Sequence, residues 1–365
     1  TNVNGSERFR ISSDGSLSTP TLGTSNVRFG VNAGNSITSG GNFNVLIGDE
    51  AGTAITTGEQ NVGVGFEALK SVTTSDNNVA VGMRALQANQ TGTKNTALGN
   101  QALFACTGDE NTAVGANAGV SVTSGTRNTL MGVFAGDALD TGRDNIAIGH
   151  LALSDETKGD NNIAIGSHCL ENQNNTSNVD SYNVGVGYNA GFAVTTGVRN
   201  TLIGGLTGDA LTTGDNNVAL GFNALSAETQ GDRNIAIGTD ALAAQNNTSD
   251  TDAYNIAIGF QSGVAVTTGV QNTLIGGEAG DALTDADFNV ALGHQALSGD
   301  TLGSRSTAIG RAALRAQNFT SATDAYNVAV GMNAGLSVTT GIQNTIIGGL
   351  AGDALQASSE NVVIG

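Results

Sequence analysis

The chain has 365 residues, of which 53 are Gly, one is Pro, none is Trp and only 4% are aromatic. Bulky side chains are too few to fill a thick globular core, while a hydrophobic content of 39% argues against disorder. The formal net charge of −18 excludes binding to nucleic acid or anionic membranes, and no apolar run approaches the length of a membrane span.

Residues 1–25 precede the first repeat and are predicted to form an N-terminal connecting segment. The first residues, Thr1 to Ser6, have the character of the interior of a longer chain, and the last, Asn361 to Gly365, stop inside a repeated motif. We therefore expect this sequence to be a fragment of a longer protein.

From residue 26 to the end, one five-residue motif recurs: Asn, a β-branched residue, a variable residue, a large apolar residue and Gly. Position 1 is Asn in every copy except Ser306, position 2 is Val, Ile or Thr, and position 5 is always Gly. The twenty copies start at 26, 44, 61, 78, 95, 111, 128, 145, 162, 183, 200, 217, 234, 255, 272, 289, 306, 327, 344 and 361. Fixed-period repetition of this kind is typical of stacked repeat architectures.

The starts of most motifs follow a 17-residue period, as at 111, 128, 145 and 162, but the units that start at 162, 234 and 306 are longer, 21-residue units. The starts 111, 183, 255 and 327 are therefore equivalent, and from 111 onward the pattern repeats as a four-unit block with a 72-residue period. Within each block, position 9 runs Gly, Gly, Leu, Leu, and position 3 becomes Leu or Ile once, at Leu130, Leu202, Leu274 and Ile346. Tandem duplication of a four-unit block explains this register.

A 17-residue period is too short for a pair of helices, so each unit is predicted to hold one β-strand and to form one turn of a parallel β-solenoid. Because side chains alternate along a strand, positions 2 and 4 should line the interior. The mostly Ala position 3, for example Ala164 and Ala236, should then face a neighbouring chain. The Gly column indicates a backbone with positive φ, and the Asn column an amide ladder or a cap on the turn before the strand.

The segments 161–167 (NNIAIGS) and 111–118 (NTAVGANA) resemble the head repeats of YadA-like trimeric autotransporter adhesins. The resemblance covers residues 26–365, although the units here are longer than is typical of that family. It implies a left-handed parallel β-roll in which three identical chains pack about one axis.

The segment from Glu7 to Gly15 (ERFRISSDG) is similar to one that precedes such repeats in bacteriophage tail-fibre and related virion proteins. This similarity implies a structural shaft of a tail fibre, located in the virion, that contributes to host-surface attachment. Its partners would be two further copies of itself, other fibre or baseplate proteins and host surface polysaccharide. One alternative is a bacterial trimeric adhesin head at the cell surface, and a less favoured one is a polysaccharide-cleaving tailspike enzyme.

The 21-residue units carry the candidate functional residues, since insertions in solenoids form loops on one face, often the binding face. Three of the four Tyr residues lie there, and Asn, Asp and Tyr suit contacts with sugar hydroxyls and rings. The candidate receptor contacts are Tyr182, Tyr254, Tyr326, Asn174, Asn246 and Asn318. The competing interpretation, which we favour, is a structural bulge in which each Tyr covers the following strand.

No catalytic, cofactor or metal site is predicted, and the protein is not expected to be an enzyme. The histidines fall in separate units, and no Cys/His cluster has zinc spacing. Cys169 occupies position 8, which is otherwise nearly always Ala, so it should be a small buried residue. Cys106 lies four units away, too far for a disulfide within the chain.

Overall fold

A computed structural model describes residues 2–3, 6–7, 10–11, 17–18 and 23–365, and these residues form strands but no helix. By their contacts they fall into two units, one ending at Ser181 and one from Tyr182 to Gly365. The predicted boundary of the connecting segment after residue 25 stays a prediction, because much of segment 1–25, including most of the ERFRISSDG motif, lies outside the described residues.

In the first unit, two short antiparallel pairs precede the repeats: β1 (Asn2–Val3) with β2 (Ser6–Glu7), and β3 (Arg10–Ile11) with β4 (Leu17–Ser18). Nine three-residue strands then pair in parallel, each with the next turn of the coil. They are β5 (Val27–Phe29), β6 (Val45–Ile47), β7 (Val62–Val64), β8 (Val79–Val81), β9 (Thr96–Leu98), β10 (Thr112–Val114), β11 (Thr129–Met131), β12 (Ile146–Ile148) and β14 (Ile163–Ile165).

The second unit contains eleven such strands in one parallel ladder. They are β16 (Val184–Val186), β17 (Thr201–Ile203), β18 (Val218–Leu220), β20 (Ile235–Ile237), β22 (Ile256–Ile258), β23 (Thr273–Ile275), β24 (Val290–Leu292), β26 (Thr307–Ile309), β28 (Val328–Val330), β29 (Thr345–Ile347) and β30 (Val362–Ile364). Every predicted motif thus supplies one strand, which confirms the all-β parallel solenoid with one unit per turn.

The predicted orientation of the strand faces was wrong. The side chains at position 3, including Ala164 and Ala236, are fully buried inside the coil, whereas their neighbours at positions 2 and 4 point outward and stay partly exposed. The physical reason is space, since Ala at position 8 and Leu at position 9 already occupy much of the interior. A narrow coil has room for one small inward side chain per strand and not for two branched ones.

The few large residues at position 3 show the same limit. Leu130 is buried between Gly119 and Gly136, the position-9 residues of the preceding turn and of its own. A Cβ on these glycines would lie 2.6 Å and 2.8 Å from Leu130 methyl carbons. The Gly, Gly, Leu, Leu alternation in the sequence is therefore complementary packing, in which Leu at position 3 fills the space that Leu at position 9 fills elsewhere.

The Gly and Asn columns behave as predicted. Gly276 at position 5 has φ +137, and a Cβ there would lie 2.6 Å from the carbonyl oxygen of Gly293 in the next turn. Asn217 Nδ2 donates to Asn200 Oδ1 at 3.2 Å and to the turn carbonyl of Gly231 at 2.9 Å. The buried amides thus form a ladder along the coil and also cap each turn, which combines the two predicted roles.

The outward face of the ladder is apolar. Exposed large hydrophobic side chains at positions 2 and 4 are Val27, Phe29, Ile47, Val79, Leu98, Met131 and Ile165 in the first unit, and Val218, Leu220, Val290, Leu292, Ile347, Val362 and Ile364 in the second. At position 6, beside them, lie Val31, Phe66, Met83, Val133, Tyr188, Phe222, Phe260 and Met332. These exposed apolar side chains all lie on the outward side of the strands.

Candidate functional site

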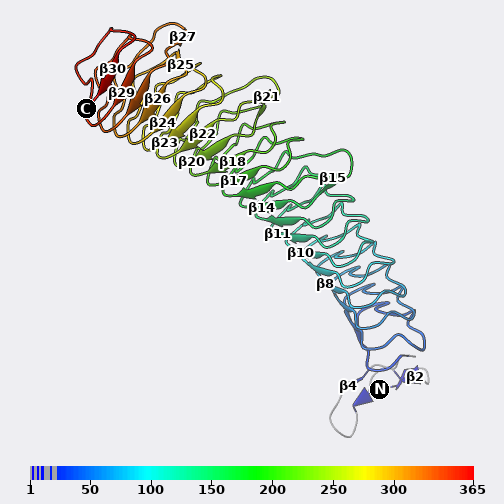
Figure 1. Cartoon of the computed structure of the whole chain (residues 1–365). Coiled ribbons are helices and arrows are strands. Elements are labelled where there is room, and N and C mark those ends of the chain that lie inside the picture. The colour runs from blue at the N-terminus through cyan, green and yellow to red at the C-terminus, as the bar shows by residue number, and fades with distance from the viewer. Residues whose placement is uncertain (1, 4–5, 8–9, 12–16, 19–22) are drawn as a thin grey trace. The chain divides into compact units, whose positions relative to one another are not determined.

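Each 21-residue turn adds a short parallel strand pair outside the main ladder. The pairs are β13 (Gly159–Asp160) with β15 (Val179–Asp180), β19 (Gly231–Asp232) with β21 (Thr251–Asp252), and β25 (Gly303–Ser304) with β27 (Thr323–Asp324). In the second unit the main strands run along one side of the coil, and the loops that carry β21 and β27 project from another (Figure 1). The insertions are therefore built into the fold and leave the apolar strand face uncovered.

A buried carboxylate holds the base of the first insertion. The side chain of Glu156 is fully buried, and its Oε1 accepts hydrogen bonds from the backbone N–H groups of residues 157–159, at 2.7–2.9 Å, and of Asn175 at 3.1 Å. Its Oε2 accepts from Gln173 Nε2 at 2.7 Å and Asn175 Nδ2 at 2.9 Å. Six donors thus replace the water that this carboxylate gives up on burial.

The second insertion repeats this network residue for residue. Glu228 Oε1 accepts from the backbone N–H groups of residues 229–231 and of Asn247, and its Oε2 accepts from Gln245 and Asn247. Gln245 Oε1 in turn accepts from Asn255 Nδ2 at 3.0 Å, which connects the network to the Asn ladder. Loop and coil are therefore linked through one chain of buried hydrogen bonds.

The third insertion has a reduced form of the network. Asp300 Oδ1 accepts from the backbone N–H groups of Gly303 and Phe319 at 3.1 and 3.0 Å, and Gln317 Nε2 donates to Oδ2. The shorter Asp side chain makes fewer hydrogen bonds, and Phe319 replaces the Asn that supplies a second donor in the other two insertions. This insertion is therefore held by fewer polar contacts than the first two.

The three predicted Tyr residues occupy equivalent, exposed positions. Tyr182, Tyr254 and Tyr326 are 53%, 47% and 50% exposed, and each has φ near +50. The Arg233 guanidinium lies 5.5 Å from the Tyr254 ring centroid, and Arg305 lies 5.8 Å from that of Tyr326. The Tyr side chains therefore do not fold into the coil, but an Arg of the preceding turn lies against two of them.

The three Asn residues that were predicted as receptor contacts lie at the start of the insertions and not at their tips. Asn174 and Asn318 are exposed and Asn246 is half-buried. Each Oδ1 accepts a hydrogen bond from a Thr hydroxyl of the preceding turn, at 3.1 Å for Asn174 and Asn318 and at 2.9 Å for Asn246. Whether any of these Asn or Tyr residues touches a receptor stays a prediction.

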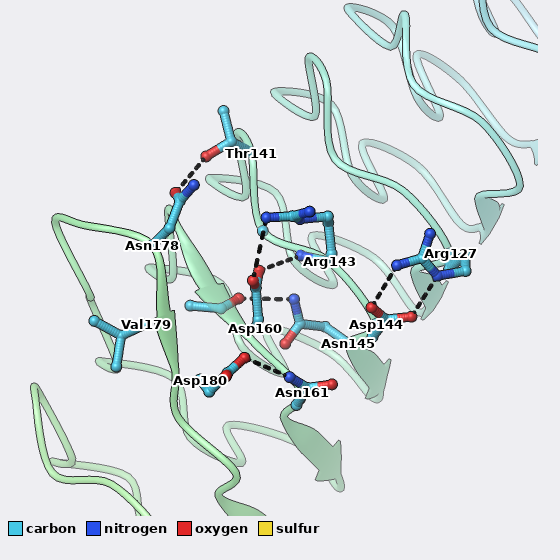
Figure 2. A network of polar contacts seen from close by, with 12 residues as sticks. Arg127, Thr141, Arg143, Asp144, Asn145, Asp160, Asn161, Asn178, Val179 and Asp180 are labelled. Carbon is cyan, nitrogen blue, oxygen red and sulfur yellow. Dashed lines mark hydrogen bonds and ion pairs between the residues drawn. The ribbon is translucent and has the colours of Figure 1, made fainter.

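Polar contacts also connect the first insertion to the turns before it (Figure 2). Asn161 Nδ2 donates to Asp180 Oδ1 at 2.8 Å, and Thr141 Oγ1 donates to Asn178 Oδ1 at 3.2 Å. In the second and third insertions an Arg takes the place of Asn161: Arg233 pairs with Asp252, and Arg305 Nε lies 2.9 Å from Asp324 Oδ1. Every insertion therefore has one Asp tied to the residue that precedes the motif of its own turn.

Ion pairs and burial shift the pKa of several Asp residues in these turns. A two-pronged contact with Arg127, at 2.6 and 2.7 Å, lowers the pKa of Asp144. Burial raises the pKa of Asp160 and Asp232, although each accepts a backbone hydrogen bond. These acidic side chains in the turns thus have structural partners.

Sequence reasoning missed both the buried carboxylates and the Arg contacts to Tyr. A usable signal was present at position 12, which holds Val122, then Leu139, then Glu156 and Gln173, with the same change in the next two blocks. A carboxylate at a position otherwise filled by inward aliphatic residues indicates a buried polar network. The Arg contacts to Tyr could not be predicted from the sequence. The Arg and the Tyr each precede a motif Asn, in neighbouring turns, and the sequence does not show that side chains at this position lie side by side.

The remaining chemically reactive residues form no site within the described part of the chain. Cys106 and Cys169 are both buried free thiols, and burial raises the pKa of each to about 12. His150 and His168 lie in adjacent turns with ring centroids 5.3 Å apart, and Glu171 contacts His168. Among residues 23–365 and the short described strands before them, no group of three or more His, Cys, Asp or Glu residues is placed to hold a metal ion.

In comparisons with known proteins, no family model and no curated protein matches the chain. The part of the chain that the structure describes contains no helix long and apolar enough to span a bilayer. Functional assignment therefore rests on the residues and their geometry.

Proposed function

We propose that this chain forms part of the shaft of a bacteriophage tail fibre and that it assembles as a homotrimer in the virion. The observation that carries the proposal is the apolar outward face of the strand ladder. In most turns at least one of positions 2, 4 and 6 exposes a large apolar side chain, on a chain whose net charge is −18. Burying these columns against two further copies would remove them from water.

The parallel ladder suits a mechanical role. Each turn hydrogen-bonds to the next through backbone, Asn side chains and turn caps, so bending the coil would disrupt several ladders at once. The insertions leave the strand face uncovered, and they would therefore remain accessible for contact with the host surface after three chains have packed together. Attachment through the shaft would then add to binding by a fibre tip.

Deletion of one whole block tests the shaft function. Removing residues 255–326, which is one 72-residue period, keeps the register of all remaining turns. Because parallel strands lie about 4.8 Å apart, the loss of four turns should shorten the fibre by about 19 Å in electron micrographs of virions. A fibre of unchanged length would place this chain outside the shaft. Finding the chain in the bacterial envelope instead of in virions would favour the surface adhesin.

A further inference from the structure

One side-chain group occurs at the second and third insertions and nowhere else among the described turns: an exposed Tyr, the Arg of the preceding turn and an Asp of the insertion. Arg233 pairs with Asp252 and faces Tyr254, and Arg305 pairs with Asp324 and faces Tyr326. Both groups lie in the second compact unit, from Tyr182 to Gly365. A planar ring, a carboxylate and a guanidinium therefore recur together at a spacing of four turns.

The fold does not require a ring at this position. The residue before the motif Asn has positive φ in every described turn. Most turns without an insertion place Gln, Asn, Lys, Glu, Asp, Ser or Arg there, and only Phe43 and Phe288 place a ring there. A Tyr is costly there, because bulky residues disfavour the left-handed region, and half of its surface stays in water. Three insertions nevertheless have Tyr at this point, in a chain with four Tyr in total.

Buried hydrogen bonds hold the base beneath these groups. The buried carboxylates of Glu228 and Asp300 connect the start of each insertion to backbone N–H groups of the preceding turn, and Gln245 and Gln317 extend the network to the Asn ladder. A contact surface fixed in this way loses little conformational entropy when it binds. The insertions thus differ from loops held only at their ends.

We propose that each insertion is a preformed contact site for an uncharged polysaccharide of the host surface. The Tyr ring offers an apolar body with a polar hydroxyl, the Asp carboxylate accepts hydrogen bonds from neighbouring sugar hydroxyls, and the Arg donates to ring or hydroxyl oxygens. The net charge of −18 repels anionic polymers. This inference rests on the proposed host-attachment role and names its ligand class and residues.

The three sites are not equal. The third has Phe288 as well, with Arg305 4.7 Å from its ring centroid, whereas the first has Asn161 in place of Arg. Binding should therefore be strongest at the third insertion and weakest at the first. Sites about 19 Å apart on each of three chains would act together on one long polymer, so weak single contacts combine through effective concentration.

The test replaces the three Tyr by Asn, which keeps a residue type that tolerates positive φ and removes only the ring. The matched control is Phe43→Asn, an exposed aromatic at the same position of a turn without an insertion. Both proteins are measured on an array of immobilised bacterial surface polysaccharides, uncharged and anionic, and on host cells before and after periodate oxidation of vicinal diols.

The proposal predicts that the wild type and the Phe43 variant bind uncharged polysaccharides, that the triple variant loses at least tenfold in apparent affinity although its melting temperature is no lower than that of the wild type, and that periodate abolishes cell binding. Triple-variant binding equal to wild type, binding only to anionic polymers, or cell binding that survives periodate would overturn it. None of these results bears on fibre length after the block deletion, so the shaft function can survive the loss of the glycan site.

Discussion

The strand side and the insertion side of each turn follow different rules. On the strand side most turns are alike: outward β-branched residue, inward small residue, outward large residue, then Gly at positive φ, with a large inward Leu or Ile once in each block. On the insertion side the turns differ within each block, and the difference lies in single residues such as Glu156 and Gln173, which convert an aliphatic interior into a hydrogen-bonded one. A repeat fold can thus keep one face nearly uniform while the residues of another vary from turn to turn.

The largest effect is expected from placing a charge on each side of one strand, which tests which positions face the interior of the coil. Ala236→Glu puts a carboxylate without a partner inside the coil and should cost about 3–5 kcal/mol, measured by denaturant unfolding. Ile237→Glu, one residue further on, points outward and should leave the stability of a single chain nearly unchanged while preventing trimer formation. Equal destabilisation of isolated chains by both variants would contradict the observed face assignment.

Two adjacent glycines, Gly276 and Gly277, test whether the Gly column is required by the backbone conformation and the close approach of the next turn. Gly276→Ala places a Cβ 2.6 Å from the Gly293 carbonyl oxygen at φ +137, and we expect a loss of about 3 kcal/mol. At Gly277 the nearest atom to a new Cβ is His294 Cδ2 at 3.6 Å, an ordinary contact, so Gly277→Ala should change thermal stability little. The account of the Gly column fails if the two melting temperatures fall by the same amount.

The buried carboxylate provides the matching test on the insertion side. Glu228 Oε2 accepts hydrogen bonds from the side-chain amides of Gln245 and Asn247. In Glu228→Gln an NH2 group would face these two donors, so we expect the free energy of unfolding to fall by about 2 kcal/mol. Because turns in a solenoid contact only their neighbours, hydrogen exchange should rise in residues 228–254 and stay unchanged two turns away. Glu278→Gln, a half-exposed carboxylate that accepts from Gln295, is the control. Uniform exchange along the unit would show that the network does not hold the insertion locally.

The smallest expected effect concerns Asp209, whose pKa is raised by burial and whose Oδ1 has no hydrogen-bond partner within the described structure. The folded state holds this proton more tightly than the unfolded chain, so stability from this group is present at low pH and falls as pH rises through the folded pKa. Asp209→Asn should therefore raise stability at neutral pH by less than about 1 kcal/mol, since the side chain is partly solvated. A melting temperature that falls at pH 7 would indicate that the carboxylate has a partner in the assembled protein.

The repeat spacing alone predicted the parallel solenoid, the strand positions, the Gly and Asn columns and the sites of the insertions, because each depends on the regular period of the motif. The direction of the strand faces was not predictable in the same way. Ala at position 3 fits both a tight interface and a narrow interior, and only the packing of positions 8 and 9 decides between them. The carboxylate networks depend on contacts between neighbouring turns, such as Glu156 with Asn175, which a turn-by-turn comparison of position 12 would have indicated.

The central claim is that the outward apolar columns pack against two further copies of the chain. Static light scattering coupled to size-exclusion chromatography tests it directly on the protein in solution. The account predicts a mass three times that of the 36.4 kDa chain for the wild type and a single-chain mass for Ile237→Glu. A folded, soluble wild-type monomer that shows no concentration dependence would contradict it.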